Sequence, residues 1–162
     1  MSEHTGKRAL ITGASRGIGA ATALTLARAG AAVIINHLGD DSGAARVAEQ
    51  VRECGSSALI YECDVSDHAA IAAMIADATG AVGDIDYLIN NAGITRDAAI
   101  WNLSDEAWDE VIAVNLKGCF NTINALAGRF RERKSGRIVN VASINGLRGK
   151  FGQANYSAAK AG

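Results

Sequence analysis

The sequence lacks long apolar runs and has no excess of either charge. No segment of the 162 residues reaches the roughly eighteen uninterrupted apolar residues that cross a bilayer, and the N-terminal MSEHTGKR has no apolar signal core. The 16 basic and 17 acidic residues are interspersed and give a formal net charge of -1, so no basic face invites nucleic acid or an anionic membrane. These absences predict a soluble cytoplasmic protein that binds neither nucleic acid nor a membrane.

Cysteine and histidine are also scarce, at three residues each. Cys54, Cys63 and Cys119 lack the paired spacing of a metal site or a disulfide framework, and no two histidines are placed as ligands. We therefore expect reduced, mostly buried thiols and no metal.

Short apolar runs alternate with longer stretches of helical periodicity. The expected strands are 8–12, 32–36, 58–63, 86–90 and 137–141, and the expected helices are 17–29, 42–53, 67–79 and 104–133. This alternation predicts an α/β fold of one domain, residues 1–162, with a Rossmann-like doubly wound parallel sheet between helices in three layers. Ligands of such folds bind outside the carboxyl ends of the strands.

The helix expected at 104–133 has one polar residue on its apolar stripe. Trp108, Val111, Phe120 and neighbouring apolar residues recur at three- and four-residue spacing, and Asn115 falls on the same face. A buried amide must find hydrogen-bond partners, so Asn115 either binds neighbouring backbone or serves a functional site. The pattern alone leaves both roles open.

The sequence TGASRGIG, residues 12–19, joins the first expected strand to the first expected helix. Glycines permit a tight turn and let backbone N–H groups approach a pyrophosphate at the helix N-terminus. The spacing differs from the G-x-G-x-x-G of the commonest dinucleotide fingerprint. The candidate cofactor residues of this turn are Gly13, Ser15, Arg16, Gly17, Ile18 and Gly19.

Tyr156 and Lys160 lie four positions apart, on one face if the segment is helical. An ammonium at about 4 Å stabilises a phenolate by roughly 4 kcal/mol at an effective dielectric constant of about 20. At about 1.4 kcal/mol per pKa unit, that is enough to bring a phenol with an ordinary pKa near 10 close to neutrality. Taken alone, such a pair is typical of an ordinary helix surface.

Together these motifs resemble those of the short-chain dehydrogenases/reductases. The matching residues are TGASRGIG, Asp64 and Val65, NNAG at 90–93, Asn115, Ser143, Tyr156 and Lys160. They stand in the family's order and spacing over essentially the whole chain. The resemblance implies a nicotinamide cofactor and hydride transfer to or from a carbonyl or alcohol carbon.

The resemblance also implies roles for individual residues. Asp64 and Val65 would hold the adenine, and Asn91, Ala92 and Gly93 would support the adenosine side of the cofactor.

On the catalytic side, Ser143 would hydrogen-bond the substrate oxygen and Tyr156 would give it a proton. Lys160 would lower the tyrosine's pKa and hold the nicotinamide ribose, and Asn115 would anchor a water linking Lys160 to solvent.

The choice of cofactor depends on the end of the second expected strand. An acid there would bind the ribose 2'-hydroxyl and repel a 2'-phosphate, but the chain has Asn36, His37 and Leu38. Arg16 offers a cation for a 2'-phosphate, so NADPH is expected, with His37 beside it, and NADH is less favoured. Asp40 and the next residue, also an aspartate, would favour NAD if they folded back onto the site.

Two segments, AGITRD at 92–97 and NGLRGKFGQANYSAAKAG at 145–162, are most similar to the corresponding sequences of 3-oxoacyl-[acyl-carrier-protein] reductases and acetoacetyl-CoA reductases. That similarity implies reduction of a 3-oxoacyl thioester, a role in fatty acid biosynthesis, and acyl carrier protein as a candidate partner. Three glycines in 146–152 are expected to make the segment before Tyr156 flexible. Candidate substrate contacts are Ile144, Asn145, Phe151 and Gln153.

Two other functions stay open. One is a reductase of the same family acting on a sugar, a steroid or a cyclic ketone, and the other is a non-catalytic nucleotide-binding module.

The chain stops at Gly162, two residues after Lys160, whereas members of the family continue through further strands. The absence of proline agrees, because the family's Pro-Gly turn beside the nicotinamide comes later. We therefore expect a C-terminally incomplete copy of a homotetrameric or homodimeric reductase. Its sheet would end at an uncovered strand, and it could lack activity by itself.

Overall fold

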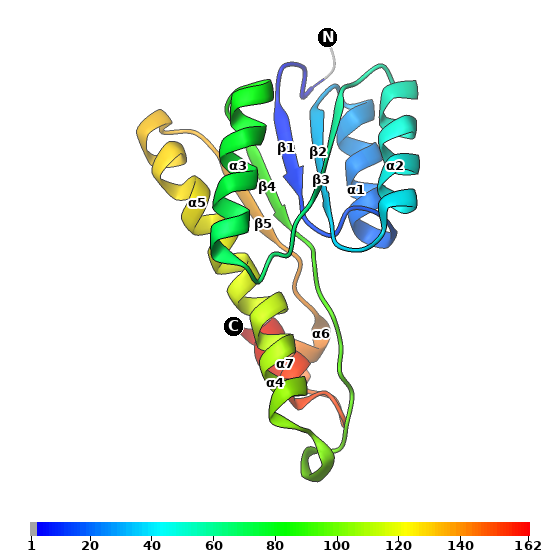
Figure 1. Ribbon diagram of the computed structural model, residues 1–162, viewed down its shortest axis with the longest axis vertical. Coiled ribbons are helices and arrows are strands. Elements are labelled where there is room, and N and C mark those ends of the chain that lie inside the picture. The colour runs from blue at the N-terminus through cyan, green and yellow to red at the C-terminus, as the bar shows by residue number, and fades with distance from the viewer. Residues whose placement is uncertain (1–2) are drawn as a thin grey trace.

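The computed structural model describes residues 3–162, and its centre is a parallel sheet of five strands in the order β3-β2-β1-β4-β5 (Figure 1). The strands are β1 (Arg8–Ile11), β2 (Ala32–His37), β3 (Ala58–Glu62), β4 (Tyr87–Asn90) and β5 (Arg137–Asn140). Each end differs from its predicted position by no more than one residue. Leu10 of β1 pairs with Ile34 on one side and Leu88 on the other, so the first strand lies at the middle of the sheet.

Helices connect the strands and cover the sheet on both faces (Figure 1). They are α1 (Gly17–Arg28), α2 (Asp41–Glu53), α3 (His68–Val82), and the pair α4 (Asp105–Ile112) and α5 (Gly118–Arg133). The predicted α/β doubly wound sheet in three layers is therefore confirmed. The chain runs from β1 toward β2 on one side and from β4 toward β5 on the other, so the strand order reverses between β1 and β4, which is where ligands bind in such sheets.

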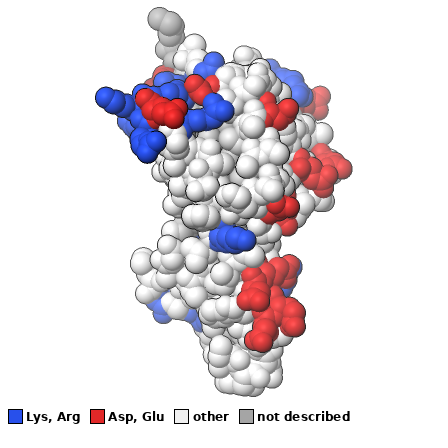
Figure 2. All heavy atoms as spheres, turned by 60° about the vertical axis from the view of Figure 1, so that its left-hand side comes forward, with Lys and Arg blue, Asp and Glu red and all other residues white. Residues whose placement is uncertain are grey.

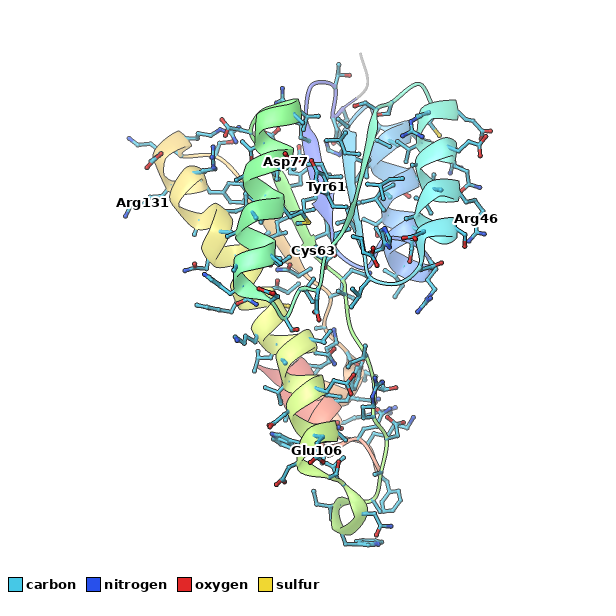
Figure 3. The ribbon with its side chains drawn as sticks, viewed as in Figure 1. Arg46, Tyr61, Cys63, Asp77, Glu106 and Arg131 are labelled. Carbon is cyan, nitrogen blue, oxygen red and sulfur yellow. The ribbon has the colours of Figure 1, made fainter. Side chains whose placement is uncertain are left out.

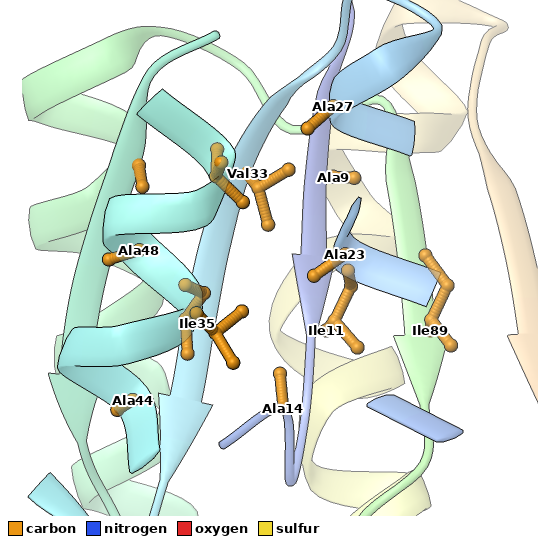
Figure 4. Packing of buried hydrophobic residues seen from close by; sticks show 13 residues of the cluster. Ala9, Ile11, Ala14, Ala23, Ala27, Val33, Ile35, Ala44, Ala48 and Ile89 are labelled. Atoms are coloured by element: carbon orange, nitrogen blue, oxygen red, sulfur yellow. The ribbon is translucent and has the colours of Figure 1, made fainter. Parts of the chain in front are cut away.

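Alanines dominate the packing between the sheet and α1 and α2 (Figure 4). Ala23 of α1 lies beside Ile11 of β1, and Ala27 lies nearer to Ala9 (Figure 4), while Ala44 and Ala48 belong to α2. These side chains are almost fully buried. Their small size lets the helices lie close to the branched side chains of the strands.

Larger side chains fill the opposite face of the sheet. Leu10 and Leu88 point to this side because successive strand residues alternate between faces. They pack with Ile71 and Ile75 of α3 and with Leu126 of α5, which is fully buried. Tyr61 of β3 adds a polar link to this layer (Figure 3), since its hydroxyl donates to Asp77 of α3 at 2.6 Å.

The helix predicted at 104–133 is interrupted. A π-helix, η2 (Ala113–Lys117), separates α4 from α5. The predicted buried stripe is wrong at two positions, because Trp108 is 38% exposed and Phe120 is 58% exposed. The π-helix adds residues to one turn, so the faces of α4 and α5 do not continue each other.

The part of the structure around Tyr156 and Lys160 extends below the sheet (Figure 1). It is built from two stretches of the chain, one with the short 3-10 helix η1 (Ile100–Asn102) and the other with α6 (Ile144–Arg148) and α7 (Ala154–Ala161). The sequence did not predict η1 or α6. A Cβ on Gly146 would lie 2.7 Å from the carbonyl carbon of Lys160, so this glycine lets α6 pack directly on α7.

Strand β5 forms one edge of the sheet within residues 3–162. All four of its residues are exposed, including Ile138 and Val139. The prediction of an uncovered fifth strand is therefore confirmed for the described residues.

Charges of both signs share the surface, as predicted. On the face seen in Figure 2, basic side chains gather at the upper left beside acidic ones, and much of the rest is neutral. Among residues 3–162, no helix has both the length and the apolar character needed to cross a membrane.

The three thiols are free. Cys63 is buried, whereas Cys54 and Cys119 are only half-buried, so the predicted burial is correct for one of the three. Within the described part of the chain, no group of three or more His, Cys, Asp or Glu side chains could hold a metal ion.

Candidate functional site

The turn TGASRGIG at 12–19, called the glycine turn below, leaves the N-terminus of α1 without a side-chain cap. Arg16 occupies the N-cap position and makes no capping hydrogen bond, and the first turn of α1 carries no acid. By contrast, side chains of Asp40, Asp67 and Ser104 cap α2, α3 and α4. The first N–H groups of a helix and its dipole attract an anion, so α1 suits a phosphate better than the other crossover helices do.

The glycine turn rests on the loop after β4. Asn91 Nδ2 donates to the backbone oxygens of Thr12 and Gly13, at 2.9 and 3.0 Å. The Thr12 hydroxyl oxygen in turn accepts from the backbone N–H groups of Asn91 and Ala92, both at 3.0 Å. The NNAG sequence therefore has a local structural task, which is to hold the backbone of the glycine turn.

Two glycines of the turn are required by close approach. Gly13 has φ +60°, and a Cβ there would lie 2.9 Å from Ala92 Cα. A Cβ on Gly19 would lie 2.5 Å from the Gly13 oxygen and 2.6 Å from Asn91 Nδ2. In contrast, Gly17 has φ +58° and open space around its missing Cβ, so the backbone at the start of α1 stays accessible.

A cavity of about 490 Å³ lies at the carboxyl ends of β1, β2 and β4. Its predicted lining residues are Gly13, Ser15, Arg16, His37, Asp64, Val65, Asn91, Ala92 and Gly93. Five residues of the predicted cofactor set do not line it: Gly17, Ile18, Gly19, Tyr156 and Lys160. The cavity thus gathers residues from five separate parts of the chain, the fifth being 110–114.

The predicted adenine residues stand at one wall of this cavity. The Asp64 carboxylate accepts from the backbone N–H of Ser66 at 2.8 Å, which fixes the turn after β3. Val65 is 6% exposed and packs so closely on the helix that a Cβ on Gly118 would lie 2.8 Å from its Cγ2.

Asp40 folds back onto the glycine turn. Its Oδ2 lies 3.4 Å from Arg16 Nη1, and its Oδ1 accepts from Gly43 N to cap α2. The Ser15 hydroxyl, the Gly43 N–H and the charge of Arg16 hold the pKa of Asp40 below its ordinary value. The cation expected to receive a 2'-phosphate is therefore already beside a carboxylate, and Asp40 meets the condition under which the sequence favours NAD.

His37 is buried at the end of β2, where it is 3% exposed. Its Nδ1 accepts from the backbone N–H of Asp40 at 3.4 Å, and its Nε2 lies 3.7 Å from Asp41 Oδ1. The ring thus supports the loop that carries both aspartates while lining the cavity.

Asn115 sits in the π-helix and is 3% exposed. Its Oδ1 accepts from Ile94 N at 2.8 Å, and its Nδ2 donates to Ile94 O at 2.9 Å. The structural role left open by the sequence is therefore present, because the amide fastens the helix to the segment after β4.

Lys160 points from α7 toward Gly93, in the segment after β4, and toward Val141, after β5. Its Nζ donates to the backbone oxygen of Val141 at 2.8 Å and lies 5.9 Å from the centre of the Tyr156 ring. A Cβ on Gly93 would lie 3.6 Å from Lys160 Nζ and 3.2 Å from Asn115 Oδ1. Burial lowers the pKa of Lys160 below its ordinary value, although the nearby Cys119 opposes this shift.

Ser143 follows β5 and forms the N-cap of α6. Its Oγ accepts from the backbone N–H of Asn145 at 3.2 Å. The structure thus brings together Gly93, Asn115, Tyr156 and Lys160, and places Ser143 at the start of the helix that packs on α7.

Several polar residues of the site escaped the sequence analysis. Asn155, which is fully buried, donates to the backbone oxygens of Arg96 and Ala107 at 3.1 and 3.0 Å. Arg96 forms a two-pronged pair with Glu110, at 2.8 and 2.6 Å, on the wall of the cavity. No local sequence pattern predicts contacts between residues so far apart in sequence.

The fold is a Rossmann-like parallel sheet flanked by helices, and comparison with known proteins identifies the family. The chain belongs to the short chain dehydrogenase family, whose sequence profile matches residues 7–162.

Its relatives include acyl thioester reductases. The chain is 47% identical over 154 residues to acetoacetyl-CoA reductase of Rhizobium meliloti (strain 1021), which covers 95% of this chain and 62% of that protein. It is 42% identical over 156 residues to 3-oxoacyl-[acyl-carrier-protein] reductase FabG of Staphylococcus aureus (strain Mu50 / ATCC 700699), covering 96% and 63%. The chain therefore spans less than two thirds of the length of these curated relatives.

A solved structure shares the fold of the chain. The crystal structure of NAD+-bound xylitol dehydrogenase matches with a TM-score of 0.94 and 32% identity, over 98% of this chain and 61% of that one.

Proposed function

We propose that this chain carries the cofactor site and catalytic group of an NADPH-dependent reductase that converts a 3-oxoacyl thioester to the 3-hydroxyacyl thioester. The observation that carries the proposal is that Lys160 and Asn115 converge on Gly93, with the Tyr156 ring beside Lys160, next to a cavity that opens at the uncapped end of α1. The thioester substrate is supported by the similarity to acetoacetyl-CoA reductase and FabG.

The residues fit a dinucleotide. Gly17 leaves open space in front of α1, whose first N–H groups can donate to a pyrophosphate. The cavity continues past Asp64 and Val65 on one side and Gly93 on the other, so adenine would lie against the former pair and the nicotinamide half near the latter. When bound, the cofactor would supply the hydride.

The chain's own residues manage the proton. Tyr156 would donate its phenolic hydrogen to the substrate oxygen as negative charge develops there, and Ser143 would donate a second hydrogen bond to the same oxygen. The positive charge of Lys160, 5.9 Å from the ring, would stabilise the phenolate left behind. Asn115 would act by holding Ile94, and hence Gly93, in position beside Lys160.

The test is a comparison of acetoacetyl-CoA with xylitol's ketone counterpart and simple cyclic ketones, each with NADPH and with NADH. We expect the highest kcat/KM for acetoacetyl-CoA with NADPH. Tyr156→Phe should abolish turnover while leaving the Kd for NADPH within about twofold, because it removes a proton donor and little binding area. Retained turnover in this variant would refute the assigned role of the tyrosine.

A second candidate is an NAD-dependent dehydrogenase of a polyol or sugar. It is favoured by Asp40, which pairs with Arg16 and would stand near the adenosine ribose. The likeness to NAD+-bound xylitol dehydrogenase points the same way.

Variants of these two residues separate the candidates. If NADPH is the cofactor, Arg16→Ala should raise the KM for NADPH about tenfold and leave that for NADH nearly unchanged, while Asp40→Asn should lower the KM for NADPH. An enzyme that prefers NADH, and whose KM for NADPH is insensitive to Arg16→Ala, would support the second candidate.

A further inference from the structure

Three polar side chains form a hydrogen-bonded chain next to the turn that carries Ser143. Asp97 Oδ2 accepts from Gln153 Nε2 at 2.8 Å, and Gln153 Oε1 accepts from Asn145 Nδ2 at 2.8 Å. Gln153, the central member, is 6% exposed. Asp97 belongs to the segment after β4, Gln153 precedes α7, and Asn145 lies in α6. The chain therefore ties together the three segments that surround the proposed catalytic group.

The direction of these hydrogen bonds is set at Asp97. A carboxylate can only accept, whereas a side-chain amide has one donating and one accepting end. Asp97 therefore requires Gln153 to turn its NH₂ group toward the carboxylate and its oxygen toward Asn145. Asn145 must then present its own NH₂ group to Gln153.

Backbone contacts continue this arrangement in both directions. Ala98 N donates to Gly152 O at 2.9 Å, so the segment carrying Asp97 is also joined to the segment carrying Gln153 through the main chain. At the other end, Asn145 N donates to Ser143 Oγ at 3.2 Å. A serine oxygen that accepts this bond keeps its hydrogen available for another acceptor.

We propose that Asp97 is a positioning residue that acts through Gln153 and Asn145. It holds the first turn of α6 so that Ser143 receives the Asn145 N–H and directs its own hydrogen toward the substrate oxygen. The catalytic consequence rests on the proposed reductase function, whereas the ordering of the Ser143 turn can be measured without turnover.

Reversing the polarity of one bond tests the chain. In Gln153→Glu, two carboxylates face each other and the link to position 97 is lost. In the double variant Asp97→Asn/Gln153→Glu, the new amide can donate to the new carboxylate, whose second oxygen still accepts from Asn145. The link between positions 97 and 153 is thereby restored, with its donor and acceptor exchanged, without restoring either original residue.

Two readouts are needed. The first is hydrogen exchange of the Asn145 backbone N–H by NMR, which we expect to accelerate about tenfold in Gln153→Glu and to return to within about twofold of wild type in the double variant. The second is kcat for acetoacetyl-CoA, expected to fall about tenfold and to recover in the same way, with a smaller change in KM. Asp109→Asn, at an exposed aspartate of α4, is the control for loss of an acidic charge.

The outcomes are distinguishable. A wild-type protein that reduces no acyl thioester refutes the proposed function, and the exchange measurement then decides alone whether Asp97 orders the turn. Exchange in the double variant that is no slower than in Gln153→Glu overturns the proposal. Restored exchange without restored kcat, in an active enzyme, overturns the catalytic part of it.

Discussion

Asn115→Ala removes both hydrogen bonds that join the π-helix to the segment after β4. The Asn115 amide is 3% exposed and makes its bonds to the backbone N–H and C=O of Ile94, at 2.8 and 2.9 Å. Alanine leaves these two backbone groups without their partners, at about 1–3 kcal/mol for each buried unsatisfied group. The two groups together give about 2–6 kcal/mol. We expect a loss of about 3 kcal/mol in the free energy of unfolding, in the lower half of that range, because water can partly rehydrate the backbone of Ile94.

Urea denaturation followed by circular dichroism measures this loss. With a slope m of about 2 kcal/mol/M, the midpoint should fall by about 1.5 M while m stays constant. Asn124→Ala is the matched control, because Asn124 is exposed on α5. It should change the free energy of unfolding by only a few tenths of a kcal/mol, and in the stabilising direction, since alanine is the better helix former.

Asn115→Asp separates the two bonds. A carboxylate keeps the acceptor for Ile94 N but turns an acceptor toward Ile94 O, so this variant should be destabilised above the pKa of its new carboxyl and recover partly at acidic pH, where the carboxyl can donate. A midpoint for Asn115→Ala equal to that of Asn124→Ala would refute the role given to the two hydrogen bonds.

Three further predictions concern packing and ionisation. Gly19→Ala places a Cβ 2.5 Å from a backbone oxygen of the glycine turn, so it should lower the free energy of unfolding by about 1–3 kcal/mol and weaken NADPH binding. Gly128→Ala, in open space on α5, should raise the free energy of unfolding by about 0.5–1 kcal/mol. Urea denaturation measures both changes in stability, and a fluorescence titration measures NADPH binding. Burial lowers the pKa of Lys160 from 10.5, so the unfolded chain binds this proton more tightly and stability should rise with pH through the window below 10.5. Lys160→Met should remove that rise from the pH profile of Tm, and an unchanged profile would contradict it. Burial and the hydrogen bond to Asp77 raise the pKa of Tyr61 to about 12, so tyrosinate absorbance should show a group titrating there that Tyr61→Phe lacks.

The sheet and its crossovers could be predicted because their signals are local. Runs such as Arg8–Ile11 and Tyr87–Asn90 are short and apolar, and each is followed by a helical period that begins after a glycine or a capping residue. The glycine turn could be predicted for the same reason, since its spacing lies within eight residues.

The support of the candidate site could not be predicted in this way. The bonds of Asn115 to Ile94, and of Asp97 to Gln153, join residues that are separated by 21 and 56 positions. The return of Asp40 to Arg16, which spans 24 positions, was foreseen only as a condition on the choice of cofactor. Such contacts depend on the path of the backbone after each strand, and that path is set by tertiary packing rather than by residue periodicity.

The π-helix at 113–117 changes the direction in which side chains point around the helix axis between α4 and α5. One residue more or less in an α-helix rotates everything beyond it by about 100° around the axis. Shortening this segment by one residue to a regular α-helix would therefore turn either Leu126 away from the sheet or Val111 away from its buried side. The two halves of the long helix thus turn their buried faces toward different parts of the protein: α5 packs on the sheet, and α4 packs on the segment that holds Tyr156 and Lys160. Asn115 lies in the π-helix between these two halves.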